Sequence, residues 1–170
     1  MFSKFLTIGA ALAAVPLIGT AANAGTRVPN DMSNCRAGSG QTAALVRVVG
    51  FKQGSGRVRV QSYSGSSNWL ESGRWLHRVD VPVRLEGRNM TVCLPLPGPG
   101  SYGIAVRHDL NNNGRSDRRD GGGFTRNPNI SFPFGMEPSY GEVSVNMREG
   151  VNNVTIVLNY LQGTRVEPIR

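Results

Sequence analysis

Short runs in which apolar and polar residues alternate extend through most of this 170-residue chain. Val79, Val81 and Val83 occupy every second position of one run, so on an extended strand all three lie on one face. No stretch after residue 24 has the length and period of a long amphipathic helix. The pattern predicts an all-β fold, an antiparallel β-sandwich of about seven strands, immunoglobulin-like or prealbumin-like, with two long loops. The predicted strands are 44–49, 57–61, 79–86, 90–96, 104–107, 143–147 and 154–160.

The alternation also predicts where side chains point. Cys93 is out of phase with its apolar neighbours, so its sulfur should point away from the core. His108 is in phase with Ile104 and Val106, which favours a packed strand-end residue over an ion ligand. Pro82 has no amide hydrogen for a ladder, so its strand should lie at a sheet edge. The expected core comprises Val46, Val48, Val58, Val60, Val81, Val83, Val92, Leu94, Ile104, Val106, Val145, Ile156 and Leu158.

The first 24 residues are typical of a secretory signal peptide. A short basic start precedes an apolar run, and the small-residue site Ala22-Asn23-Ala24 ends it. We expect cleavage after Ala24 and no transmembrane segment in the mature chain, because the apolar run is short for a bilayer span. About 146 residues then suit one domain. It would comprise an N-terminal arm at 25–41, the sandwich at 42–161 and a C-terminal tail at 162–170.

The chain has two cysteines, Cys35 and Cys93. In the periplasm or outside the cell, where a signal peptide delivers a protein, two such cysteines form a disulfide by default. A close Cys-x-x-Cys redox pair is absent from the sequence. We therefore expect a Cys35–Cys93 bridge that straps the N-terminal arm across the outer face of a sheet.

The mature chain is basic. Removing Lys4 leaves 18 basic residues against 11 acidic ones, a net charge of about +7. Such a charge suits acidic partners, namely envelope polysaccharide, anionic lipid headgroups or another envelope protein, although a merely solvated surface is the simpler alternative. No run of adjacent basic residues is longer than Arg118-Arg119, so nucleic acid is not an expected partner. We expect a monomer.

The stretch 109–120 has the pattern of a twelve-residue calcium loop. Side chains with oxygen stand at positions 1, 3, 5, 9 and 12, and glycine at position 6 permits a sharp turn. Calcium should bind weakly, with a Kd on the order of 10⁻⁴ to 10⁻³ M. The alternative is an Asn-Gly-rich turn held by Asx hydrogen bonds without any ion. The predicted metal ligands are Asp109, Asn111, Asn113, Arg115 through its carbonyl, Asp117 and Asp120.

Two long connections, 64–77 and 110–140, interrupt the rhythm of the strands. Loops of this length in a compact domain are usually functional or ordered by their own packing. Both are rich in aromatic residues, and the first contains Trp69 and Trp75. One interpretation is a small aromatic core that covers an open end of the sandwich. The other is a platform on which Trp69 and Trp75 bind a sugar ring or a peptide.

Several motifs follow one another in a characteristic order. A strand begins after Pro99-Gly100 and leads into His108-Asp109, which is followed by Asn111, Asn113, Gly114 and Asp117. Gly123-Phe124, Phe134-Gly135 and Pro138-Ser139-Tyr140 come next. Over roughly 42–161 this order resembles a family of secreted bacterial proteins catalogued as domain of unknown function 2141. The resemblance implies a small exported β-sandwich without an established reaction. The arginine-rich loop and the paired cysteines depart from the family pattern.

Catalysis has little support in the sequence. His77 and His108 lie in different connections, no serine stands in a Gly-x-Ser-x-Gly elbow, and both cysteines are expected to be bridged. We therefore expect a non-catalytic module of the bacterial cell envelope, periplasmic or secreted, whose calcium-binding-like loop serves structure or interaction. The alternative function is a carbohydrate- or peptide-binding module that uses the loop aromatics.

Overall fold

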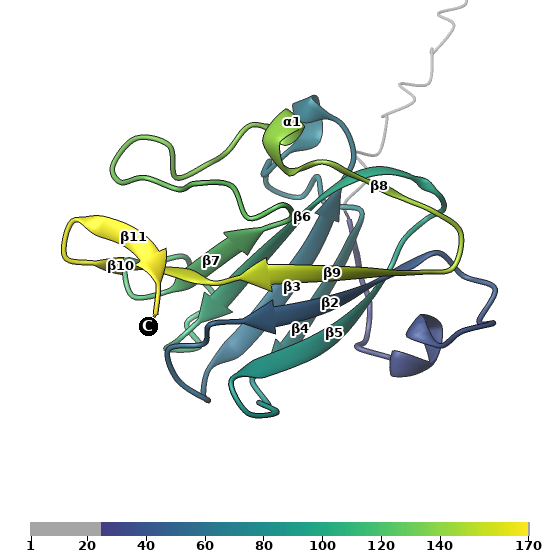
Figure 1. Cartoon of the computed structure of the whole chain (residues 1–170), viewed down its shortest axis with the longest axis horizontal. Coiled ribbons are helices and arrows are strands. Elements are labelled where there is room, and N and C mark those ends of the chain that lie inside the picture. Colours follow the sequence, from purple (N-terminus) through teal and green to yellow (C-terminus); the bar gives the residue numbers. More distant parts are fainter. Residues whose placement is uncertain (1–24, 170) are drawn as a thin grey trace, which may run out of the picture.

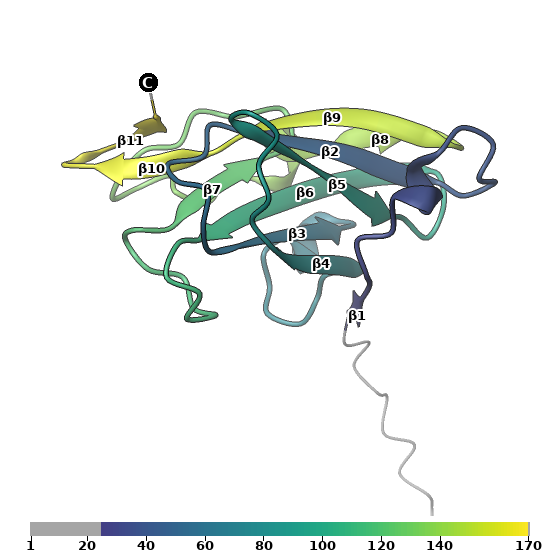
Figure 2. The same cartoon turned by 90° about the horizontal axis from the view of Figure 1, so that it is seen from below.

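The computed structural model describes residues 25–169, so the predicted signal peptide lies outside the described residues. Two sheets pack against each other as in a sandwich (Figures 1 and 2). The larger has the strand order β1 (Thr26–Arg27), β4 (His77–Pro82), β3 (Arg57–Tyr63), β6 (Gly100–Asp109), β7 (Gly121–Phe124), β10 (Asn159–Gln162) and β11 (Arg165–Pro168), with β8 (Val145–Met147) also paired to β6. The smaller has the order β5 (Asn89–Pro95), β2 (Ala43–Val49) and β9 (Val151–Val157).

Helical structure within residues 25–169 is limited to short turns. They are the 3₁₀ helices η1 (Met32–Cys35) and η2 (Ser66–Asn68) and the α-helix α1 (Tyr140–Val143). No helix in this range reaches the length and apolarity needed to cross a bilayer. The mostly β, two-sheet architecture predicted from the alternation is confirmed, and the immunoglobulin-like or prealbumin-like topology stays a prediction.

The expectation of purely antiparallel sheets is wrong. β9 runs parallel to β2, with Val154 opposite Val46, and β1 runs parallel to β4. Period two locates a strand and its buried face, but a strand that pairs in either direction has the same alternation. Strand direction was therefore beyond the reach of the sequence pattern.

The core lies between the two sheets and follows the predicted phase. Eleven of the thirteen predicted core residues are buried, whereas Val81 and Val145 are only partly buried and pack against the core from its margin. Val81 lies beyond the short stretch of β4 that β1 covers, since β1 pairs only with His77 and Arg78. Pro82, at the end of β4, is exposed on this uncovered edge, as predicted.

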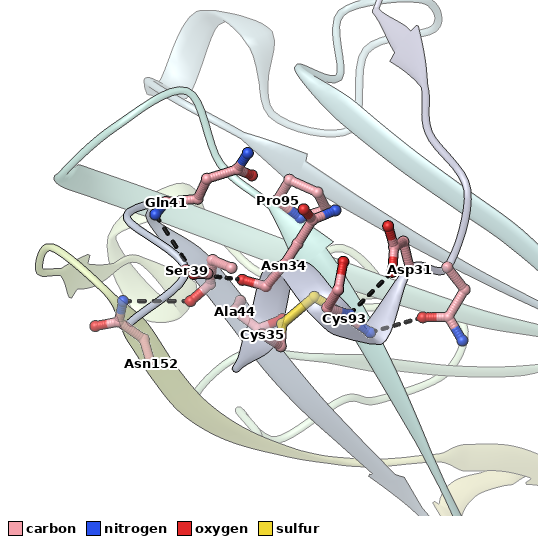
Figure 3. The surroundings of a disulfide bond; sticks show 12 residues. Asp31, Asn34, Cys35, Ser39, Gln41, Ala44, Cys93, Pro95 and Asn152 are labelled. Carbon is pink, nitrogen blue, oxygen red and sulfur yellow. Dashed lines mark hydrogen bonds between the residues drawn. A yellow bond between two sulfur atoms is a disulfide. The ribbon is translucent and has the colours of Figure 1, made fainter. Parts of the chain in front are cut away.

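A disulfide between Cys35 and Cys93 joins the N-terminal arm to the smaller sheet (Figure 3). Cys93 lies in β5 opposite Leu45 of β2, out of phase with the core residues Val92 and Leu94. The arm that covers it contributes a further contact, because the Asn30 Oδ1 atom accepts a 2.8 Å hydrogen bond from the Cys93 amide. The predicted bridge across the outer face is confirmed.

Strand β7 was not predicted, because three of its four residues are glycine. A Cβ atom at Gly121 would lie 2.4 Å from the Tyr160 ring, and one at Gly123 would lie 2.4 Å from the Val157 carbonyl oxygen. These two glycines are therefore required by close packing. The C-terminal segment expected as a tail also differs, since residues 165–168 form β11 and pair with β10.

Candidate functional site

A groove of about 740 Å³ lies on the outer face of the larger sheet. Outward-facing residues of β3, β6 and β7 form its floor, namely Gln61, Ala105 and Gly122. The two long loops and the C-terminal hairpin contribute the rest of its lining. Small-molecule sites commonly occupy roughly 300–1,000 Å³, so the groove has the size of such a site.

Gly122 makes the floor of the groove deep. Its neighbours in β7, Gly121 and Gly123, face the core and have no room for a side chain. At Gly122, by contrast, a Cβ atom would meet only the Val106 carbonyl oxygen, at 3.9 Å, and the backbone is not left-handed. Neither packing nor conformation requires glycine here. Its missing side chain leaves open space beside Arg107, which lies opposite Gly122 in β6.

The two tryptophans predicted to bind a ligand have different surroundings. Trp69 packs edge-on against Tyr63 and Tyr140 and tilted against Phe124, and its Nε1 atom donates to the Pro138 carbonyl at 2.7 Å. It thus helps to join the two long loops, as the interpretation of a small aromatic core expects. Only Trp75 lines the groove, and its ring lies beneath the Arg78 guanidinium, 5.2 Å from the ring centroid.

The other apolar residues of the groove come from both loops, from β7 and from the C-terminal hairpin. In the loop after β7, Ile130, Phe132 and Met136 line the groove, whereas Phe134 is 86% exposed and lies outside the lining. Most of the lining is hydrocarbon, aliphatic as well as aromatic. The apolar lining includes Leu70, Trp75, Phe124, Ile130, Phe132 and Met136.

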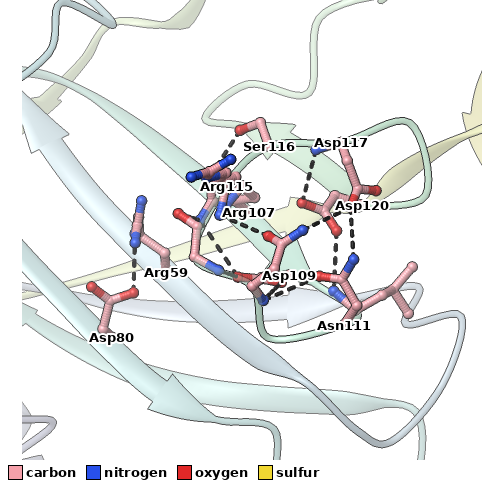
Figure 4. A network of polar contacts seen from close by, with 12 residues as sticks. Arg59, Asp80, Arg107, Asp109, Asn111, Arg115, Ser116, Asp117 and Asp120 are labelled. Carbon is pink, nitrogen blue, oxygen red and sulfur yellow. Dashed lines mark hydrogen bonds and ion pairs between the residues drawn. The ribbon is translucent and has the colours of Figure 1, made fainter.

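A second hollow of about 310 Å³ adjoins the groove and is lined by five arginines, here called the arginine cluster. Two aspartates, Asp80 and Asp109, are the acidic residues of this lining. Asp80 accepts from Arg59 Nε at 3.0 Å (Figure 4). It also accepts from Arg78. The cluster therefore keeps an excess of positive charge. Its members are Arg27, Arg57, Arg59, Arg78 and Arg107.

The alternation contained a signal for this cluster. Arg57, Arg59 and Arg107 stand out of phase with the core valines of their strands, so each faces outward. In the sheet, Arg59 lies opposite Asp80 on one side and opposite Arg107 on the other. The pairing of β4, β3 and β6 thus brings together residues that are distant in the sequence. The prediction missed the cluster because it did not include that pairing.

The pKa values of two arginines in the cluster are lowered. Burial lowers the pKa of Arg107, and the neighbouring charge of Arg59 lowers it further. Burial also lowers the pKa of Arg78, against the opposing effect of Asp80. Burial raises the pKa of Asp80, but hydrogen bonds from Arg78 and Arg59 outweigh it, so the net shift is downward. The Asp80 carboxylate therefore stays ionised, and with Asp109 it neutralises only part of the charge of the five arginines.

The predicted metal ligands all lie together in the loop 109–120 (Figure 4). Asp109 accepts hydrogen bonds from the amides of Asn113, at 3.2 Å, and Gly114, at 2.8 Å. The Asn111 side-chain oxygen accepts from the Asn113 amide, and the Asn113 side-chain oxygen accepts from the Arg115 amide. These bonds are those of successive Asx turns.

The other two carboxylates of this loop also accept hydrogen bonds from residues of the loop. Asp117 accepts from the side-chain amides of Asn111 and Asn113. Asp120 accepts from the amides of Leu110, at 3.1 Å, and Asp117, at 3.2 Å. Among residues 25–169, no three acidic, histidine or cysteine side chains converge in an arrangement that could hold a metal ion. A calcium ion would therefore need amide and carbonyl oxygens as well, and would compete with the loop's own hydrogen bonds.

His108 is a buried packing residue, as predicted. Its Nε2 atom lies 2.7 Å from the Ser55 carbonyl, and its Nδ1 atom lies 2.6 Å from the Tyr160 hydroxyl. Burial lowers the pKa of His108 and raises the pKa of Tyr160 to about 12. A neutral imidazole that donates from Nε2 and accepts at Nδ1 satisfies both contacts.

The family model described as "Uncharacterized protein conserved in bacteria (DUF2141)" matches residues 46–155. Four members of the arginine cluster and Gly122 lie inside this range, whereas Arg27 and the C-terminal hairpin lie outside it. The comparisons with curated proteins and with solved structures find no match for the chain. The resemblance inferred from the order of motifs is thereby confirmed.

Proposed function

Since the chain belongs to the bacterial family DUF2141, whose description names no activity, we propose its function from its own geometry. It is a non-catalytic binding module, exported to the periplasm or beyond, that holds the apolar part of a small ligand in the groove. The observation that carries this proposal is the open floor at Gly122 beneath an apolar lining. The disulfide supports export, because such bonds persist in oxidising compartments.

The lining favours a hydrocarbon over a sugar ring. A sugar platform needs an uncovered aromatic face, but Arg78 covers Trp75, and Trp69 packs against three other aromatic rings. Leucine, isoleucine and methionine side chains contribute beside the aromatics. Such surfaces gain most by removing hydrocarbon from water, at roughly 25 cal/mol per Å² buried.

Nile red, an uncharged apolar dye, tests this proposal. Its fluorescence should rise on addition of the protein, because the dye leaves water for the groove. The Gly122→Leu variant should lose most of this rise, since the new side chain fills the floor without a backbone clash. Gly141→Leu is the matched control: Gly141 also has open space around it but lies on α1, outside the groove lining. Equal fluorescence with both variants would place the dye elsewhere and refute the proposal.

Calcium in the loop 109–120 is a second and separate candidate. Burial raises the pKa of Asp120, and the negative charges of Asp117 and Asp109 raise it further despite two amide hydrogen bonds. A bound cation would offset that repulsion. The loop would then serve to brace the groove, since Asp117 and Asp120 also line it.

A melting curve of ion-stripped protein tests the calcium candidate. With a Kd on the order of 10⁻³ M, about 10 mM calcium should stabilise the fold by roughly 1.4 kcal/mol, a shift of a few degrees. Magnesium should do less, because it prefers a tighter octahedral shell. Asp109→Ala should abolish the shift, whereas the control Arg118→Ala should leave it intact. An unchanged melting temperature in the wild type would establish the Asx turn without an ion.

A further inference from the structure

The groove and the arginine cluster form one continuous surface. Arg59, Arg78 and Arg107 line both hollows, so the apolar and the basic part share a border. A ligand that lies across this border contacts hydrocarbon at one end and guanidinium groups at the other.

The acidic residues of the cluster have little capacity left for its arginines. The two carboxylate oxygens of Asp80 already accept from Arg59 and Arg78. Those of Asp109 accept from backbone amides and approach Arg107 only to 3.7 Å. Arg107 donates from Nη1 to the Ser116 hydroxyl and from Nη2 to the Gly114 carbonyl, whereas Arg59 donates to Asp80 from its Nε atom. Among the described residues, the Nη groups of Arg59 are therefore the donors that an acceptor from outside the protein would meet first.

Two buried side-chain nitrogens within residues 25–169 have no hydrogen-bond partner, and both belong to residues that line the groove. They are Arg107 Nε and Trp75 Nε1. Unpaired buried donors are costly, typically by about 1–3 kcal/mol each, so native structures seldom leave them unsatisfied. Arg107 Nε is closed to solvent, so an oxygen-rich group at the border would become its acceptor only if the side chain turned outward.

We propose that the ligand of this groove is an anionic amphiphile with a single hydrocarbon chain. Its carboxylate or phosphate binds at Arg59 and Arg107, and its chain lies over Gly122 against the apolar lining. Guanidinium groups match both headgroups, because their planar donors bind two oxygens at once. This inference rests on the proposed function of the groove and adds the charge of the ligand to it.

Electrostatics support the same assignment. Burial lowers the pKa of Arg78 and of the partly buried Arg107; neighbouring arginine charge lowers both further, while Asp80 opposes the shift in Arg78. A bound anion would offset the repulsion between the arginines and so raise the pKa of both. Screening by salt should therefore weaken binding of the charged amphiphile more than binding of a neutral one.

Isothermal titration tests the proposal with four probes below their micelle concentrations. They are dodecanoate, dodecyl phosphate, the uncharged ester monolauroylglycerol, and inorganic phosphate. At least one charged amphiphile should bind about ten-fold or more tightly than the uncharged ester, the difference that one charged hydrogen bond supplies. Preference for dodecanoate or for dodecyl phosphate identifies the headgroup. Inorganic phosphate should bind far more weakly, because it lacks the chain.

Variants separate this inference from the proposed function. Arg59→Gln should weaken the charged amphiphile about ten-fold and leave the uncharged ester unchanged, and Arg107→Gln should repeat the effect. Arg47→Gln is the matched control, because it removes the same charge from an exposed position on the smaller sheet. Circular dichroism checks that each variant is folded.

Each outcome has a definite meaning. Equal affinity for charged and uncharged amphiphiles, with no effect of Arg59→Gln, would overturn the anionic assignment. If Gly122→Leu then still blocked the uncharged ester, the proposed function would stand. Binding that Gly122→Leu does not alter would overturn both. Tighter binding of an acidic oligosaccharide such as oligogalacturonate than of either charged amphiphile would also overturn the amphiphile.

Discussion

Removing the disulfide is the perturbation whose effect follows most directly from the structure. The bridge joins residues separated by 58 positions. Closing a loop of that length in the unfolded chain costs about 4 kcal/mol of conformational entropy, which the Cys35→Ser/Cys93→Ser double variant would regain on unfolding. For a domain of this size the melting temperature should fall by roughly 10 to 15 °C.

The folded arm should remain in place in that variant. Asn30 still accepts from the amide of residue 93, and β1 still pairs with β4. Asn30→Ala is therefore a useful comparison, because it leaves the bridge but removes the acceptor of a part-buried amide. It should cost about 1–2 kcal/mol. The order of melting temperatures should be wild type, then Asn30→Ala, then the double serine variant.

Differential scanning calorimetry, with and without a reducing agent, makes the measurement. The reduced wild type should melt at a temperature close to that of the double variant. The intact mass of the unreduced wild type should be lower by two hydrogens than the mass of the chain with free thiols. A double variant that melts within about 2 °C of the wild type would refute the loop-entropy reasoning.

Three further predictions concern the core. Ile156→Asp should unfold the domain, because it places an unpaired carboxylate between the sheets; a native circular dichroism spectrum would show that the register is wrong. Burial lowers the pKa of His108, so the unfolded chain takes up a proton first, near pH 6.5, and stability present above that pH should fall below it. Urea midpoints at neutral and acidic pH measure this, and His108→Gln should flatten the difference. Gly123→Ala should destabilise by roughly 1–3 kcal/mol through its clash with Val157. Gly122→Ala, tested by the same thermal melts, should be near neutral.

The alternation predicted strands and buried faces because each strand contacts the core on one side only. It located the six strands β2, β3, β4, β5, β6 and β8 and the region of β9 and β10. It failed at β7, because close packing against Tyr160 and Val157 requires glycine at the inward positions. These positions therefore lack the apolar side chains from which a strand is predicted. It also failed for the direction of β9, since a parallel and an antiparallel strand bury the same alternate residues.

The sequence predicted less of the candidate site than of the fold. The disulfide could be predicted, because two cysteines with an expected export leave one pairing. The arginine cluster could not, because Arg59, Asp80 and Arg107 become neighbours only through sheet register. The open floor of the groove depends on Gly122. In the sequence it cannot be told apart from Gly121 and Gly123, which are glycines for a different reason, close packing in the core.

The parallel pairing of β2 with β9 also sets the order in which the chain can fold. β2 is the central strand of the smaller sheet, and its partner residues in β9 follow it by about a hundred positions, Ala43 lying opposite Val151. Contacts between such distant residues slow folding, because a large loop must close before they form. During synthesis, β2 is available early but has no partner on that side until nearly the whole chain has been made. The smaller sheet is thus completed late, whereas β3, β4, β6 and β7 of the larger sheet can pair before β9 has been made.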